Sequence, residues 1–330
     1  MPGVAGGLAL TLFRAAIIKR RATLTQSDAI FSIPICRESV VVNSVALSYV
    51  VGGSNNPPIE TMPYLMTPMP LLLLILICCA LPLQSANLTL EQRISEGLDT
   101  PALAGKALWL EAEGVRFLAI HSPARSKKRL GGALLLHDAG AHADWMEVIH
   151  PLRRYLSAQG WDTLSLQLPA TDTRPDALAA STLVNQAAPR IQAAVDHFAT
   201  QEQRNLVLVG HGLGAAMALN YAFAQRNDAI KGVAAIGVSI SVDDEQDPAR
   251  QAIAQLEIPI LDLFGSRDLA DVTGSAAERH RVAVENGRDR YRQERVNGAD
   301  HFFKGLQTNL THRVHGWMRR VTAGDDKGKD

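Results

Sequence analysis

The sequence predicts an α/β fold: a mostly parallel central sheet that opens with an antiparallel hairpin and is covered by helices on both faces. Three observations support this prediction. Short apolar runs typical of buried strands alternate with helical segments between residues 133 and 320, a pattern typical of βα units. Two earlier apolar runs joined across Glu113-Gly114 indicate the hairpin. The connection from Val238 to Pro248 is short, so no cap domain is expected.

Each element is predicted from its periodicity and flanking residues. The hairpin strands are expected at residues 107–112 and 115–121. Later strands are expected at residues 133–136, 161–168, 205–209, 231–238, 258–264 and 291–296. Helices are expected at residues 145–158, 184–200, 213–224, 248–256, 276–286 and 305–320. A basic loop at residues 126–131 is expected to be a solvated turn, with contact to an anionic surface as the alternative.

The overall composition is that of a globular protein without a strong charge bias. The chain has 330 residues, with 33 Lys and Arg against 33 Asp and Glu, which gives no support to a nucleic-acid partner. All three cysteines lie before residue 87, so the later part of the chain holds no disulfide or thiol nucleophile. The histidines show no H-x-x-x-H or H-E-x-x-H pattern, so neither a metal site nor a cofactor is expected.

Residues 62–86 have the features of a secretory signal peptide. An apolar block from Leu71 to Leu83 precedes Gln84-Ser85-Ala86, small residues suited to signal peptidase. The block is shorter than the about 20 residues that a membrane-spanning helix needs. Residues 1–61 are then an over-extended start or disordered, with a separate targeting peptide as the alternative. We expect one domain at residues 87–330, periplasmic or secreted, with peripheral association with the cell envelope as a further alternative.

The stretch from Asn205 to Ala222 places a glycine-rich turn between a strand and a helix. Written as G-x-G-x-x-A, this turn fits a dinucleotide-binding site. Written as G-H-G-L-G, it fits a nucleophile elbow in which Gly212 stands where a serine would be. The dinucleotide interpretation requires a carboxylate about 20 residues later, at the end of the next strand. That strand ends in V-S-I-S, and the first acid after it is Asp243. We therefore favour the elbow.

Three further motifs, like the elbow, come at the ends of predicted strands. Residues 261–268 end a late strand in a G-x-x-D turn, residues 297–303 follow the last strand, and residues 137–140 (HDAG) follow the third strand. All would lie at the carboxyl edge of the sheet, where α/β folds bind ligands. With these motifs, residues 107–320 resemble the α/β-hydrolase superfamily, and within it an uncharacterised family of exported bacterial α/β-hydrolase-like proteins of unknown function.

The resemblance implies a catalytic triad without its attacking atom. His301 would be the base and Asp268 the carboxylate that orients it, with Asp262 and Asp243 as alternatives for the acid. Gly212 occupies the nucleophile position and has no side chain. Loss of the nucleophile costs about 10⁶-fold in kcat in a well-studied triad.

The resemblance also implies an oxyanion hole around the elbow. The backbone N–H of Leu213 would be one donor, and Asp138 or Ala139 would supply the other. Because a carboxylate repels a developing oxyanion, we expect Asp138 to turn outward and cap the next helix; facing inward, it would become a substitute nucleophile or base. His137 and His211 are expected to order the oxyanion loop and to pack beside the elbow.

These residues leave three functions open. The first, which we favour, is a weak or non-catalytic binder of an unidentified small ester-like or acyl-like ligand. The second is an esterase-like hydrolase that uses water activated by His301, or uses Asp138. The third is the dinucleotide-binding protein, which we regard as the least supported. The ligand, the oligomeric state and any residual catalysis are not indicated by the residues.

Overall fold

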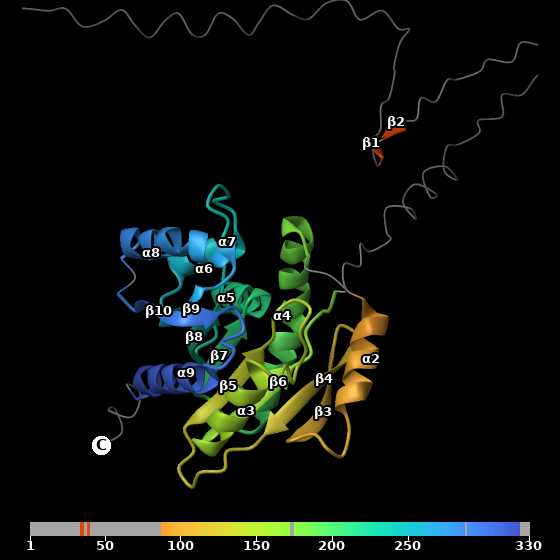
Figure 1. Ribbon diagram of the computed structural model, residues 1–330. Helices are drawn as coiled ribbons and strands as arrows, with labels where there is room; N and C mark the ends of the chain where they lie inside the picture. Colours follow the sequence, from red (N-terminus) through yellow and green to blue (C-terminus); the bar gives the residue numbers. More distant parts are fainter. Residues whose placement is uncertain (1–33, 36–37, 40–86, 172–174, 288, 324–330) are drawn as a thin grey trace, which may run out of the picture. The chain divides into compact units, whose positions relative to one another are not determined.

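The computed structural model describes residues 34–35, 38–39, 87–171, 175–287 and 289–323 (Figure 1). The chain forms two compact units, residues 1–73 and 74–330. In the first unit, strands β1 (Pro34–Ile35) and β2 (Glu38–Ser39) form an antiparallel pair. The predicted signal peptide lies outside the described residues. No helix within the described ranges is long and apolar enough to cross a membrane.

The second unit is built on an eight-stranded sheet with the order β10-β9-β8-β7-β5-β6-β4-β3. Its strands are β3 (Lys106–Ala112), β4 (Val115–Ser122), β5 (Gly131–Leu136), β6 (Trp161–Leu166), β7 (Leu206–His211), β8 (Ile230–Ile236), β9 (Ile260–Arg267) and β10 (Tyr291–Asp300). All neighbouring strands from β10 to β6 run parallel, whereas β4 is antiparallel to β6 and to β3. The predicted fold class and the opening hairpin are thus confirmed.

Helices cover both faces of this sheet (Figure 1). They are α2 (Leu88–Leu98), α3 (Ile149–Ala158), α4 (Ala177–Thr200), α5 (Leu213–Gln225), α6 (Pro248–Gln255), α7 (Ala270–Gly274), α8 (Ala276–Glu285) and α9 (Gln307–Thr322). Apolar residues of α4, α5, α6 and α8 pack in one core cluster, and those of α3 and α9 pack in a second. The sheet therefore separates two hydrophobic layers.

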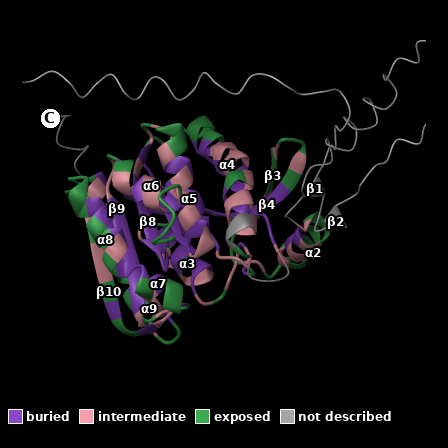
Figure 2. Cartoon of the chain, turned by 90° about the horizontal axis from the view of Figure 1, so that it is seen from above, coloured by how far each residue is buried: buried purple, intermediate pink, exposed green. Residues whose placement is uncertain are grey.

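The central strands are buried on both faces, as a parallel sheet requires (Figure 2). In β5, Leu134 and Leu136 join the first cluster, while Ala133 and Leu135 join the second. This alternation follows from the two-residue period of a strand. Within this sheet, several exposed side chains along one strand occur only in the edge strands β3 and β10.

Several element bounds differ from the predicted ones for local reasons. Helix α3 begins at Ile149 rather than at residue 145, because the preceding segment is a loop in which Asp144 bonds to His150 and Arg153. Helix α4 begins earlier than predicted, since Asp176 caps it by accepting from the N–H of Ala179. Helices α2 and α7 were not predicted. The N-cap of α2 is Asn87.

Candidate functional site

Five loops meet at the carboxyl edge of the sheet, and each follows one parallel strand. They carry Asp138 after β5, Gly212 after β7, Gly237 after β8, Asp268 after β9 and His301 at the end of β10. Parallel strands end at the same edge of a sheet, so residues far apart in sequence are brought into one region. The predicted site motifs therefore lie together.

Gly212 forms the sharp turn between β7 and α5. Its backbone angles are φ 54° and ψ −119°, a region that side chains rarely adopt and that marks a strained strand-to-helix turn. Gly210 and Gly214 stabilise this turn by allowing close approach: a Cβ on either would lie closer than 3.0 Å to backbone atoms of the neighbouring helix or strand. The glycines are thus explained by strand–helix packing, without a dinucleotide.

His301 and Asp268 form a buried pair. Nδ1 of His301 lies 2.6 Å from Oδ1 of Asp268, and the Asp268 side chain has no exposed surface. Asp268 is itself fixed, because its carboxylate accepts from the N–H groups of Gly265 and Leu269. The two other carboxylates that the sequence left open lie elsewhere. Asp262 is buried against Arg279, and Asp243 is exposed.

Asp138 points into the site, contrary to the expectation that it turns outward. Its Oδ2 lies 2.9 Å from Nε2 of His301, and its Oδ1 accepts from the N–H of Leu213 at 2.6 Å. A Cβ built on Gly212 would lie closer than 3.0 Å to Cγ and to both carboxylate oxygens of Asp138. The carboxylate therefore fills the space that an elbow side chain would occupy. The inward position is favoured because it pairs the carboxylate with an imidazole and a free backbone donor.

The electrostatics of the site hold His301 in its charged form. Burial opposes this charge, but the hydrogen bonds to Asp138 and Asp268 outweigh burial and raise the pKa of His301 to about 9. For Asp138, burial acts in the opposite direction, yet the bond to His301 lowers its pKa to about 2. At neutral pH the site is therefore an imidazolium between two carboxylates. A protonated imidazole cannot act as a general base.

Two further histidines position this group. His137 donates from Nδ1 to the carbonyl of Asp138, while its Nε2 accepts from the N–H of Leu168. Burial lowers the pKa of His137 to about 4, consistent with the neutral tautomer that these bonds require. His211 is also buried, and its Nε2 faces the carbonyl of His301 at 2.9 Å. Each of these rings therefore holds the backbone of a loop that carries a site residue.

A metal ion was not expected, yet three side chains of ligand type lie together. Among the described residues, Asp138, His211 and His301 offer ligand atoms within 4.8 Å of one another. Both ring nitrogens of His301 already contact carboxylates, and one nitrogen of His211 faces a carbonyl. A cation at this position would therefore have to displace the bond between Asp138 and His301.

A cavity of about 570 Å³ lies over this group. Asp138, Ala139, Gly212, Leu213 and His301 are among the residues that line it. Its wall also contains residues that the sequence patterns did not indicate: Asp176, Ser181, Gly237, Ser239, Asp244 and Asp271. A Cβ on Gly237 would lie 3.0 Å from two ring atoms of His301, so a side chain there would press on the imidazole. The sequence indicates this position only through a glycine directly after a buried strand.

Comparison with solved structures defines the class of the fold. The chain is similar to Est1E from Butyrivibrio proteoclasticus, with 14% identity over 66% of this chain and 99% of that one, at a TM-score of 0.53. It is also similar to a dienelactone hydrolase from Anabaena variabilis, with 19% identity over 65% and 96% of the two chains, at a TM-score of 0.53. An α/β serine hydrolase without lid from Xanthomonas campestris gives 16% identity over 67% and 96%, at a TM-score of 0.50. The chain thus has an α/β-hydrolase fold.

The family of the chain follows from a match of its sequence to a family model. A family model described as "Protein of unknown function (DUF3530)" matches residues 80–189 and 174–320. The chain belongs to this family. No curated protein matches it.

Proposed function

We propose that the cleft binds a small ester-like or acyl-like ligand and that the protein does not carry out serine-type acyl transfer. One observation supports this above all: the carboxylate of Asp138 occupies the space of the missing serine side chain and engages the N–H of Leu213. Serine-type acyl transfer requires a serine hydroxyl as the attacking group and a free oxyanion donor. In this arrangement, the first is absent and the predicted donor is already bonded.

The charge state of His301 supports the same proposal. A serine triad needs a neutral imidazole that can accept the serine proton. Here both ring nitrogens contact carboxylates, which favours the imidazolium. Even with a nucleophile supplied, His301 would first have to lose a proton and its partner Asp138.

The cleft remains suitable for binding. Its described lining combines five aspartates and the hydroxyls of three serines with apolar side chains such as Val184, Leu213 and Ile240. A volume of several hundred Å³ is typical of small-molecule sites. The resemblance in fold to esterases adds the expectation that the ligand carries an ester or acyl group.

A second function is favoured by the orientation of Asp138. One of its oxygens is held by the backbone N–H of Leu213, and the other faces His301. This is the arrangement that a carboxylate nucleophile or base would need beside an acid–base imidazole. Hydrolysis by water activated at His301 requires the neutral ring, so its rate would increase as the pH approaches about 9.

The experiment introduces a serine at position 212, with and without the Asp138 carboxylate that would obstruct it. Wild type, Gly212→Ser and the double variant Gly212→Ser/Asp138→Ala would be treated with a fluorophosphonate and with short-chain nitrophenyl esters. We expect labelling of the double variant only, because a serine side chain introduced alone at the elbow would overlap Asp138. The matched control is Gly212→Ser/Asp176→Asn, which removes another cleft carboxylate but leaves Asp138 in place. A folded double variant without labelling would show that the proposed register of the triad is wrong.

The same assay separates the two functions. Ester turnover by wild type that disappears in His301→Ala would favour the hydrolase and end the proposal of binding alone. Absence of turnover, with binding of a substrate ester to the cleft, would support the binder.

We also propose that the domain functions outside the cytoplasm, in the bacterial periplasm or secreted. This proposal rests on the apolar block at residues 71–83 and the small residues that follow it.

A further inference from the structure

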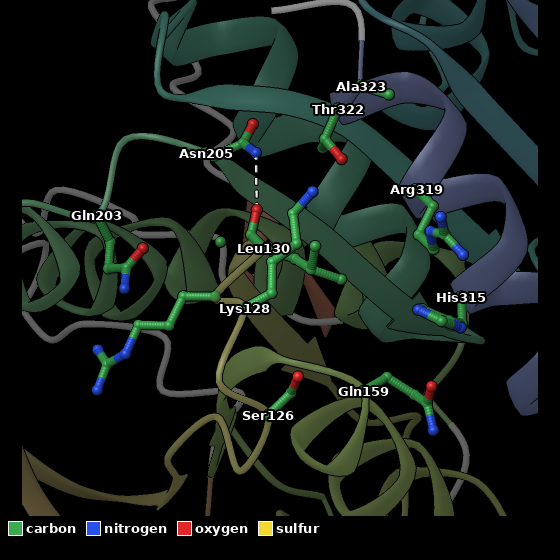
Figure 3. Close-up of a pocket in the computed structure, with 12 residues that line it drawn as sticks. Ser126, Lys128, Leu130, Gln159, Gln203, Asn205, His315, Arg319, Thr322 and Ala323 are labelled. Atoms are coloured by element: carbon green, nitrogen blue, oxygen red, sulfur yellow. Dashed lines mark hydrogen bonds between the residues drawn. The ribbon is translucent and has the colours of Figure 1, made fainter. Parts of the chain in front are cut away.

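A second pocket lies at the opposite edge of the sheet, where the parallel strands begin. It has a volume of about 500 Å³ and is enclosed by the loop before β5, the segment after α3, the start of β7 and the end of α9 (Figure 3). Lys128, Arg129 and Arg319 line it, and its described lining contains no Asp or Glu. The protein as a whole has a formal net charge of zero, so this concentration of cations is local.

The cations of this pocket are only partly compensated. Arg129 lies 3.3 Å from Asp162, but Lys128 and Arg319 form no ion pair with any described carboxylate. Helices α3 and α9 end at the pocket, since their C-caps, Gln159 and Ala323, line it. Each helix end contributes about −0.5 charge. Against two such ends, three cations leave the pocket positive by roughly one to two charges.

His315 provides an independent indication of a ligand. Its side chain comes from α9, lines the pocket and is buried, with the residue 9% exposed. Nε2 of this ring has no hydrogen-bond partner in the described part of the chain. Figure 3 shows Lys128 reaching into the pocket from the loop, with Arg319 and His315 on the α9 side. A buried polar atom without a partner is rare and indicates an absent water, ion or ligand atom.

The loop that carries Lys128 is fixed in place. The N–H of Leu130 donates to the carbonyl of Gly160, and the side chain of Asn205 donates to the carbonyl of Leu130 at 2.8 Å. A Cβ on Gly160 would overlap the carbonyl of Lys128, so the loop packs closely against the turn after α3. Cations on a fixed loop lose less entropy on binding than cations on a free one.

We propose that this pocket binds a phosphate-type oxyanion, through Lys128 and Arg319 with Nε2 of His315 as a further donor. Phosphate oxygens accept several charge-assisted hydrogen bonds at once, and arginine and lysine are their usual partners. The pocket is larger than phosphate alone, so the group is expected to be part of a phosphate ester. That group could belong to a free metabolite or to an anionic lipid headgroup.

The test uses variants in pairs. Lys128→Gln and Arg319→Gln remove cations that line the pocket, whereas Lys127→Gln and Arg320→Gln remove the same charges from neighbouring positions that do not line it. Inorganic phosphate would be titrated into the purified protein by calorimetry, with the His315 ring followed by NMR. Binding to sedimented vesicles of phosphatidylcholine, with and without phosphatidylglycerol, would be measured in parallel.

A site for free oxyanions would be supported if phosphate binding shifts the His315 resonances. The affinity should also weaken about tenfold in Lys128→Gln and in Arg319→Gln but not in the control variants Lys127→Gln and Arg320→Gln. Binding only to vesicles that contain phosphatidylglycerol, lost in the pocket variants alone, would support the lipid headgroup. No binding in either arm, or equal losses within each pair, would overturn the proposal and leave the cations as partners of the two helix ends.

Discussion

Replacing Asp138 by asparagine tests the electrostatics of the candidate site directly. Asparagine has the shape of aspartate and keeps an oxygen for the N–H of Leu213, but it removes the charge that faces Nε2 of His301. We expect His301 to become neutral at lower pH in this variant. The matched control is Asp176→Asn, which removes a charge from the same cleft and keeps a good helix N-cap.

The magnitude follows from the pKa of His301. Its rise from 6.5 to about 9 corresponds to about 3 kcal/mol of preference for the charged ring. Because burial opposes this rise, the two carboxylates together contribute more than the net value, and Asp138 contributes at least as much as Asp268. Removing Asp138 should therefore lower the pKa of His301 by at least about one unit, to about 8 or below.

The assay is an NMR titration of the imidazole, with urea unfolding at several pH values. A group whose pKa is raised on folding contributes stability that is complete below its unfolded pKa and is lost as the pH rises through the folded one. In wild type this loss should begin near pH 6.5 and be complete just above pH 9. In Asp138→Asn the loss should be complete at least about one pH unit lower, and the contribution of His301 to stability at pH 7 should be smaller by about 1 kcal/mol. A His301 pKa that stays near 9, or equal shifts in the Asp176 control, would refute the pairing.

Three further predictions concern packing, a buried ion pair and export. Gly214→Ala should destabilise the fold by about 3 kcal/mol or more, because its Cβ would overlap backbone carbonyls of residues 136 and 137. The control Gly316→Ala, which has space around it inside α9, should be neutral or stabilising by about 1 kcal/mol. Equal effects of the two substitutions in thermal unfolding would contradict this reasoning. Asp262→Asn should cost about 3–5 kcal/mol in urea unfolding because Arg279 would be left buried without its partner, and a loss below about 1 kcal/mol would argue against that ion pair. N-terminal sequencing of the protein expressed in a bacterial host should give Asn87 as the first residue of an exported form; a cytoplasmic protein that retains residues 62–86 would disprove export.

The succession of strands along the chain and the positions of most site residues could be predicted because they depend on local sequence. Apolar runs bounded by glycine and polar residues define the parallel strands, and a residue that directly follows such a strand must lie at the carboxyl edge. His301, Asp268 and Gly212 were placed in this way. Helix α7 was missed because its five residues are too few to show a helical period. Helix α2 has apolar residues at helical spacing (Leu90, Ile94 and Leu98), so the sequence did contain a signal for it.

The sequence by itself determined an α/β sheet with a glycine-rich turn between β7 and α5, because both are encoded by neighbouring residues. Only the tertiary structure decided where the Asp138 carboxylate points. Its two partners are 75 and 163 residues away, and its preferred orientation depends on the space left by Gly212 in the turn between β7 and α5. The same holds for the basic pocket, where Lys128 and Arg319 meet only after β5 and α9 have packed. Side-chain orientation reflects the balance of charge, burial and space contributed by distant residues, and no local pattern in the chain encodes that balance.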